Sequence, residues 1–153
     1  MLRRVLVATD GSGHAQRAEA FAGQLAAGAE PPEIELLYVY PQLPPRDFQP
    51  DATIPWRLEP QRTPPHIVEQ AERLLQAAVA RIRDVAGRPD MPVRCRFVTS
   101  CDVAGWIVHE ADRSGADLIV LGGRHHGGLS GILEVGVCAV VLGRSQRPVL
   151  MVP

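Results

Sequence analysis

Short apolar segments alternate with amphipathic helical segments along the whole chain, and this alternation constrains the fold more than any other feature. Parallel strands need a long crossover connection, which a helix usually provides. The segment 117–122 is apolar after its first residue, as is typical of a parallel strand covered on both faces. We therefore expect an α/β fold with a parallel sheet and helices on both faces. The predicted strands are 3–9, 33–40, 92–99, 117–122 and 148–152, and the predicted helices are 14–28, 66–87, 102–114 and 131–144.

Ligands of such sheets bind at the carboxyl ends of the strands, where the winding direction reverses. Two loops are predicted at that place, Asp10–His14 after the first strand and Gly122–Leu129 after the fourth. Residues 41–65 contain eight prolines and are expected to form an irregular surface insertion, because proline fixes φ and lacks an N–H donor. The insertion is too short to be a domain, so residues 1–153 are predicted to form a single domain.

Composition excludes several classes of function. The net charge is −1, which gives no electrostatic basis for binding nucleic acid or an anionic membrane. No apolar run approaches the roughly 18 residues of a membrane span, so a cytoplasmic protein is expected. All 16 basic residues are arginine, which excludes a P-loop and Schiff-base chemistry because both need lysine.

The cysteines and histidines allow alternative interpretations. Three cysteines with no CxxC spacing argue against a disulfide framework and a cysteine zinc site. Cys101 precedes a predicted helix, where it is either a redox-sensitive thiol or a small, partly buried residue. Cys95 and Cys138 are expected to be core or interface thiols. The pair His125-His126 is either solvated or, less favourably, part of a metal site, since no carboxylate lies near it in the sequence.

Three separated motifs resemble the universal stress protein family: VLVATDGSGHA, SGADLIVLGGRHHGGLSGILEVG and RPVLMVP. The resemblance covers essentially the whole chain. It implies a five-stranded parallel sheet in the order 3-2-1-4-5, of the adenine-nucleotide alpha-hydrolase-like fold, and usually a homodimer. Many members bind ATP or AMP, members regulate survival under stress, and most have no established catalytic activity.

The resemblance also implies roles for individual residues. Asp10 matches an acidic residue that contacts the ribose or adenine, and Val39 matches a position whose backbone holds the adenine. Family members that bind nucleotides hold the phosphates in a loop of the pattern G-x-x-G, nine residues, then G-[ST]. Glycines let backbone N–H groups approach the phosphates, while the hydroxyl and a helix N-terminus add further donors. Gly122 matches the first glycine of this loop.

The rest of the phosphate loop departs from the family pattern. His125 stands at the second glycine, Val135 at the third, and Gly136 at the Ser/Thr position, followed by Val137. Val135 is the most disruptive change, because a β-branched residue cannot adopt a positive φ at low cost. Gly127 and Gly128 could form a substitute cradle, although Gly-Gly is also common in ordinary loops. ATP or AMP binding is therefore expected to be weak or absent.

Two classes of function remain open. The preferred interpretation is a regulatory stress-response protein that acts as a dimer, with a degenerate ATP/AMP loop and possible protein partners. The alternative is a stress protein competent to bind ATP or AMP. Asp10 itself is either a ligand-binding residue or only a turn residue that caps the next helix. No catalytic constellation is identifiable, since GSGHAQRA lacks the order of an adenylating pyrophosphate loop. An apolar sheet edge at Pro148–Val152 is predicted to form the homodimer.

Overall fold

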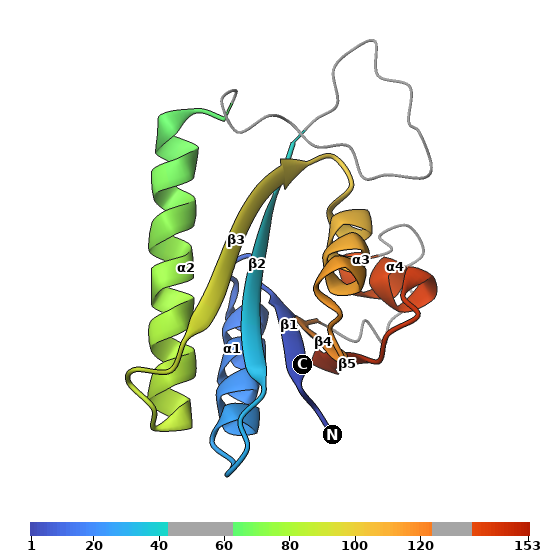
Figure 1. Cartoon of the computed structure of the whole chain (residues 1–153). Helices are drawn as coiled ribbons and strands as arrows, with labels where there is room; N and C mark the ends of the chain where they lie inside the picture. The colour runs from blue at the N-terminus through green and yellow to red at the C-terminus, as the bar shows by residue number, and fades with distance from the viewer. Residues whose placement is uncertain (43–62, 124–135) are drawn as a thin grey trace.

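The computed structural model describes residues 1–42, 63–123 and 136–153, which form an alternating series of strands and helices (Figure 1). The elements, in chain order, are β1 (Arg4–Ala8), α1 (Gly13–Ala26), β2 (Glu33–Pro41), α2 (Pro65–Ala86), β3 (Val93–Ser100), α3 (Val103–Ser114), β4 (Leu118–Gly122), α4 (Val137–Arg144) and β5 (Val149–Val152). The predicted strands and helices are confirmed, with differences at their ends.

The strands form one parallel sheet in the order β3-β2-β1-β4-β5, as the sequence led us to expect. β1 lies at the centre, and its residues Val5–Ala8 pair with Ile34–Leu37 of β2 and with Leu118–Leu121 of β4. The chain winds from β1 outward to β3, then crosses back to β4 on the other side of β1. The winding direction therefore reverses between β1 and β4.

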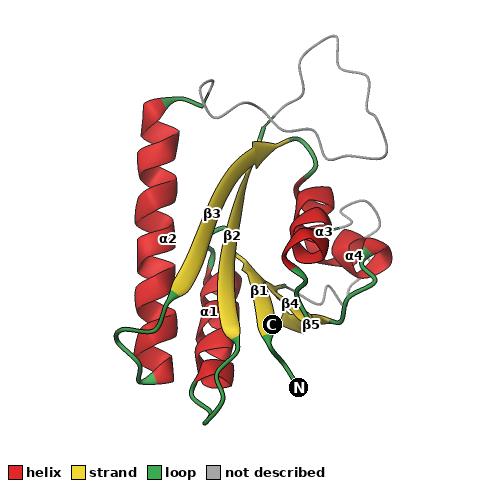
Figure 2. Cartoon of the chain, viewed as in Figure 1, coloured by secondary structure: helices red, strands yellow, loops and turns green. Residues whose placement is uncertain are grey.

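Helices cover both faces of the sheet (Figure 2). Alternate residues of β1 point to opposite faces, so that Val5 and Val7 face α1 and α2, and Leu6 faces α3 and α4. α1 presents a stripe of buried alanines to the sheet, while α2 contributes larger side chains such as Leu75 and Ile82. Burying these apolar side chains on two faces is the main force that holds the layers together.

Helix ends follow local sequence chemistry. Ser12 and Asp102 are the N-caps of α1 and α3, and each side chain accepts a hydrogen bond from the backbone three residues ahead. Asp102 also pairs with Arg144 at 3.2 Å. The helix predicted over 131–144 begins at Val137, with Gly136 as its N-cap, and residues 131–135 lie outside the described residues.

Two clusters of buried charge lie between the layers. Glu19, only 1% exposed, pairs with Arg81 between α1 and α2. On the other face Glu110, also 1% exposed, pairs with Arg96 at 3.3 Å and with Arg113. Each carboxylate thereby has a guanidinium partner, which offsets the cost of its burial.

The remaining sequence expectations have mixed outcomes. The described cysteines are all free thiols. Cys95 was predicted to be a core or interface thiol; it is exposed on the edge strand β3, so the core alternative is wrong and an interface role stays a prediction. Cys101 and Cys138 are half-buried. In the part of the chain that the structure describes, no helix is both long and apolar enough to cross a membrane. Most of the proline-rich insertion, 43–62, lies outside the described residues.

Candidate functional site

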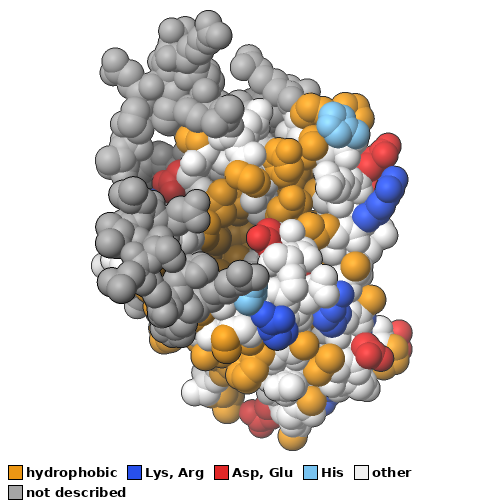
Figure 3. All heavy atoms as spheres, turned by 180° about the vertical axis from the view of Figure 1, so that it is seen from behind, with side chains coloured by type: hydrophobic (Ala, Val, Ile, Leu, Met, Phe, Trp, Pro, Cys, Tyr) orange, Lys and Arg blue, Asp and Glu red, His pale blue; other side chains and the backbone are white. Residues whose placement is uncertain are grey.

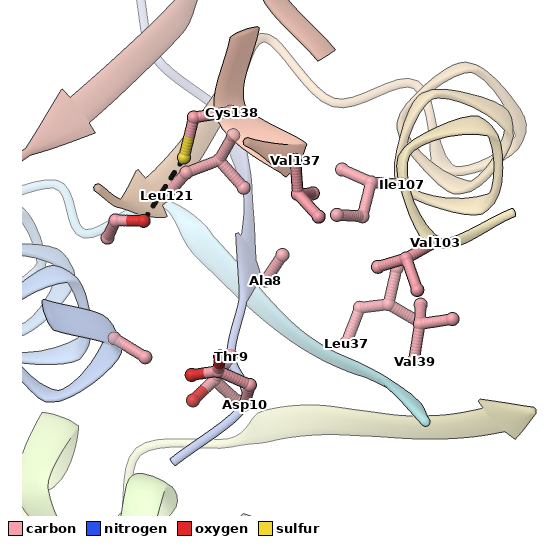
Figure 4. A pocket seen from close by; sticks show the side chains of 12 residues that line it. Ala8, Thr9, Asp10, Leu37, Val39, Val103, Ile107, Leu121, Val137 and Cys138 are labelled. Carbon is pink, nitrogen blue, oxygen red and sulfur yellow. Dashed lines mark hydrogen bonds between the residues drawn. The ribbon is translucent and has the colours of Figure 1, made fainter. Parts of the chain in front are cut away.

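A pocket opens at the carboxyl ends of the central strands, where the winding direction reverses (Figure 4). Its empty space is about 480 Å³ including the mouth, so it is an open depression and not a sealed cavity. Segments far apart in the sequence meet there, as the general rule for parallel sheets predicts. The residues that line it are Ala8, Thr9, Asp10, Ala15, Leu37, Val39, Val103, Ile107, Leu121, Gly122, Val137 and Cys138.

Four of the predicted site residues line this pocket: Asp10, Val39, Gly122 and Val137. They come from the end of β1, from β2, from the end of β4 and from the first turn of α4. Gly136 is adjacent as the N-cap of α4 but is not part of the lining. The other predicted residues, His125, Gly127 and Gly128, lie outside the described residues, as does Val135.

The pocket has a polar end and an apolar end. Thr9 and Asp10 lie together on one side, while Leu37, Val39 and Val103 face them from the other (Figure 4). Apolar side chains also gather in a hollow when the molecule is seen from behind (Figure 3). A ligand with a flat apolar part and a hydroxyl-bearing part would match this division.

Local hydrogen bonds hold the loop between β1 and α1 in place. The Gly11 N–H donates to Thr9 Oγ1 at 3.2 Å, and the Ser12 N–H donates to Asp10 Oδ1 at 2.9 Å. Gly11 has a φ of +77°, which L side chains rarely adopt, and this lets the chain turn sharply into α1. Asp10 is therefore a turn residue, and its exposed carboxylate also lines the pocket.

Gly122 occupies a position where no side chain fits. A Cβ built on Gly122 would lie 2.2 Å from the backbone carbon of His14 and 2.5 Å from the nitrogen of Ala15. The end of β4 thus touches the backbone of the first turn of α1. The resemblance to the family implies that this glycine belongs to the phosphate loop. In the structure Gly122 also allows β4 to pack against α1, and this contact needs no ligand.

Cys138 is a pocket residue whose location the sequence analysis missed. Its thiol donates a hydrogen bond to the carbonyl oxygen of Gly122 at 3.1 Å (Figure 4). Burial raises the pKa of the Cys138 thiol, and the Asp10 carboxylate raises it further. Its place directly after Val137, a predicted site residue, was the one feature in the sequence that could have revealed it.

Metal binding finds no support in the described part of the chain. No group of three or more histidine, cysteine, aspartate or glutamate side chains is arranged there to hold an ion. The pair His125-His126 lies outside that part.

The fold and pocket define an α/β protein with a pocket at the switch point of a five-stranded parallel sheet. Comparison with known proteins then identifies its family: the model of the Universal stress protein family matches residues 1–153, so the chain belongs to this family. No curated protein matches the sequence significantly.

Solved structures agree with this assignment. The chain is 29% identical to a universal stress protein crystallised in complex with cAMP, with a TM-score of 0.69 over 99% of this chain and 97% of that chain. It is 28% identical to a family member from Burkholderia pseudomallei, with a TM-score of 0.65 and coverage of 99% and 96%. A universal stress protein from Archaeoglobus fulgidus in complex with dAMP has the same fold, with 20% identity, a TM-score of 0.66 and coverage of 100% and 98%. The neighbours have the adenine-nucleotide alpha-hydrolase-like fold.

Proposed function

We propose that this chain is a regulatory stress protein whose pocket binds adenosine or a nucleoside monophosphate such as AMP, and binds ATP poorly. The observation that carries the proposal is the pocket itself. It brings Asp10, Val39, Gly122 and Val137 together at the switch point of the sheet. A structural neighbour with 29% identity was crystallised with cAMP, which supports an adenine nucleotide as the class of ligand.

The two ends of the pocket suit the two halves of a nucleoside. Leu37, Val39 and Val103 offer apolar surface to a flat adenine ring, and backbone groups near Val39 would hold its edge. Asp10 uses Oδ1 to accept from Ser12, which leaves Oδ2 to accept a hydrogen bond from a ribose hydroxyl. A carboxylate acceptor makes this bond a strong one.

The phosphate end is poorly equipped for a triphosphate. Gly136 replaces the family's Ser/Thr and supplies no hydroxyl, while His125 and Val135 replace two glycines. A hydrogen bond to a charged group contributes about 1.5–3 kcal/mol, so losing two weakens ATP binding by roughly a hundredfold to over ten-thousandfold. AMP presents fewer phosphates and loses fewer of these contacts.

Calorimetric titration with AMP and with magnesium-ATP tests the proposal. AMP should bind, and Asp10→Ala should remove most of the heat, whereas the matched change Asp112→Ala on the exposed side of α3 should not.

ATP should give no measurable heat. The triple variant His125→Gly, Val135→Gly, Gly136→Ser should gain ATP binding; a Cβ on Gly136 meets no atom within 4 Å, and its φ is −58°. Tight magnesium-ATP binding by the unmodified protein would contradict the proposal and point to Gly127 and Gly128 as the cradle.

A second candidate function, independent of nucleotide, is regulation through dimerisation and protein partners. β5 is an edge strand of the sheet, and α4 beside it exposes Leu142, half of whose surface is accessible. An apolar edge of this kind favours pairing with a second copy. Replacing Leu150 or Met151 by Asp should give monomer or insoluble protein in sedimentation experiments. A soluble dimer that survives both changes would exclude this interface.

A further inference from the structure

The polar end of the pocket is connected to a buried carboxylate beneath it. Thr9, which lines the pocket and is 5% exposed, donates its hydroxyl to Glu19 Oε1 of α1 at 2.5 Å. The other oxygen of Glu19, Oε2, pairs with the Arg81 guanidinium of α2. The chain of contacts thus leads from the pocket wall through α1 to α2.

The same hydroxyl also fixes the loop that carries Asp10. Because Thr9 donates its proton to Glu19, its oxygen is directed to accept from the Gly11 N–H, at 3.2 Å. Thr9 and Gly11 flank Asp10, so this one hydrogen bond joins the residues on its two sides and restrains the turn that carries Asp10. α2 supports the loop directly as well, since a Cβ on Gly11 would lie 2.9 Å from Leu74 Cδ1.

We propose that Glu19, held by Arg81, is a positioning residue that aims Asp10 at a hydroxyl-bearing ligand. A buried carboxylate with one guanidinium partner is costly unless its remaining lone pairs are used, and Thr9 uses one of them. Loss of Glu19 would free the Thr9 hydroxyl to rotate and would release the Gly11 bond. Asp10 would then be held only by the bond that its Oδ1 accepts from the Ser12 N–H, and its Oδ2 would be aimed less precisely at the ligand. This inference rests on the proposed function, in which Asp10 accepts from a ribose hydroxyl.

The test measures binding of two probes, AMP and 2′,3′-dideoxy-AMP, which lacks the ribose hydroxyls. Wild-type protein should prefer AMP. Glu19→Leu should weaken AMP binding by roughly ten- to a hundredfold, the worth of one hydrogen bond to a charged group. Dideoxy-AMP binding should stay within about twofold, since the analogue makes no such bond. Glu19→Gln keeps an oxygen acceptor for Thr9 and should restore most of the preference.

Glu110→Leu is the matched control. Glu110 is also 1% exposed and paired with arginines, but it lies on the opposite face of the sheet and does not line the pocket. It should lower stability without changing the ratio of the two affinities. A wild-type ratio in Glu19→Leu, or an equal change in both variants, would overturn the proposal. If Glu19→Leu does not fold, Thr9→Val removes only the hydroxyl and must show the same loss of preference.

Failure of the proposed function can be separated from failure of this inference. If the wild-type protein binds neither probe, the nucleotide proposal fails. The positioning role is then decided by amide hydrogen exchange without ligand. Exchange at Gly11 and Ser12 should be faster in Glu19→Leu than in wild type and unchanged in Glu110→Leu. Unchanged exchange in Glu19→Leu would overturn the inference.

Discussion

Replacing Gly122 by alanine should be one of the most destabilising small changes in this protein. The new Cβ would lie 2.2 Å from the His14 carbon and 2.3 Å from its oxygen. Both atoms belong to the backbone of α1, so no side chain can rotate away, and β4 and α1 must separate. Inserting a carbon into a packed interior costs about 1–3 kcal/mol, and we expect the upper end of this range here, about 3 kcal/mol or more.

Urea unfolding, followed by circular dichroism, measures this cost from the shift in midpoint at constant slope. Gly143→Ala is the matched control, because a Cβ there meets no atom within 4 Å and the residue lies inside α4. It should stabilise the protein by up to about 1 kcal/mol, the difference in helix propensity. Ordinary surface changes alter the free energy of unfolding by less than about 0.5 kcal/mol. If Gly122→Ala differs from wild type by no more than that, the packing argument is wrong.

Two further predictions concern charged groups. Asp102→Ala removes the cap of α3 and the pair with Arg144, and should cost about 0.5–2 kcal/mol in urea unfolding, whereas Asp112→Ala, which breaks an exposed ion pair, should cost less than about 1 kcal/mol. Burial, followed by the hydrogen bond with Glu110, raises the pKa of Glu35. In the unfolded chain Glu35 loses its proton near its ordinary pKa of 4.5, whereas in the folded protein it keeps the proton to higher pH. The free energy of unfolding therefore falls as the pH rises from about 4.5 through the raised pKa of Glu35. Glu35→Gln should thus raise the melting temperature more at pH 8 than at pH 5, and an equal effect at both would contradict the raised pKa.

The sheet could be predicted from the sequence because its strands are short apolar runs bounded by glycine, proline and polar residues. Val5, Leu6 and Val7 are fully buried, as a central strand requires. The strand order came from the resemblance to the family, since alternation alone allows several orders. The helix predicted over 131–144 begins at Val137 in the structure, because its N-cap Gly136 has no side chain and makes no capping hydrogen bond that the sequence could have indicated.

The supports of the candidate site could not be predicted in the same way. Glu19 and Arg81 are 62 positions apart, and no spacing rule joins them. In the sequence Glu19 resembles an ordinary charged residue of an exposed helix face, yet it is 1% exposed. Gly122 was recognised for a motif, whereas its contact with α1 depends on how closely two elements approach. Such contacts arise from three-dimensional packing, which local patterns do not encode.

The central claim is that the pocket takes an adenine nucleoside with few phosphates. The most direct measurement is extraction of the purified, unmodified protein and chromatography of whatever nucleotide it retains, followed by calorimetric titration with AMP and with magnesium-ATP. We expect adenosine or AMP in the extract and a binding heat for AMP alone. An extract that contains ATP, with tight magnesium-ATP binding in the titration, would contradict it.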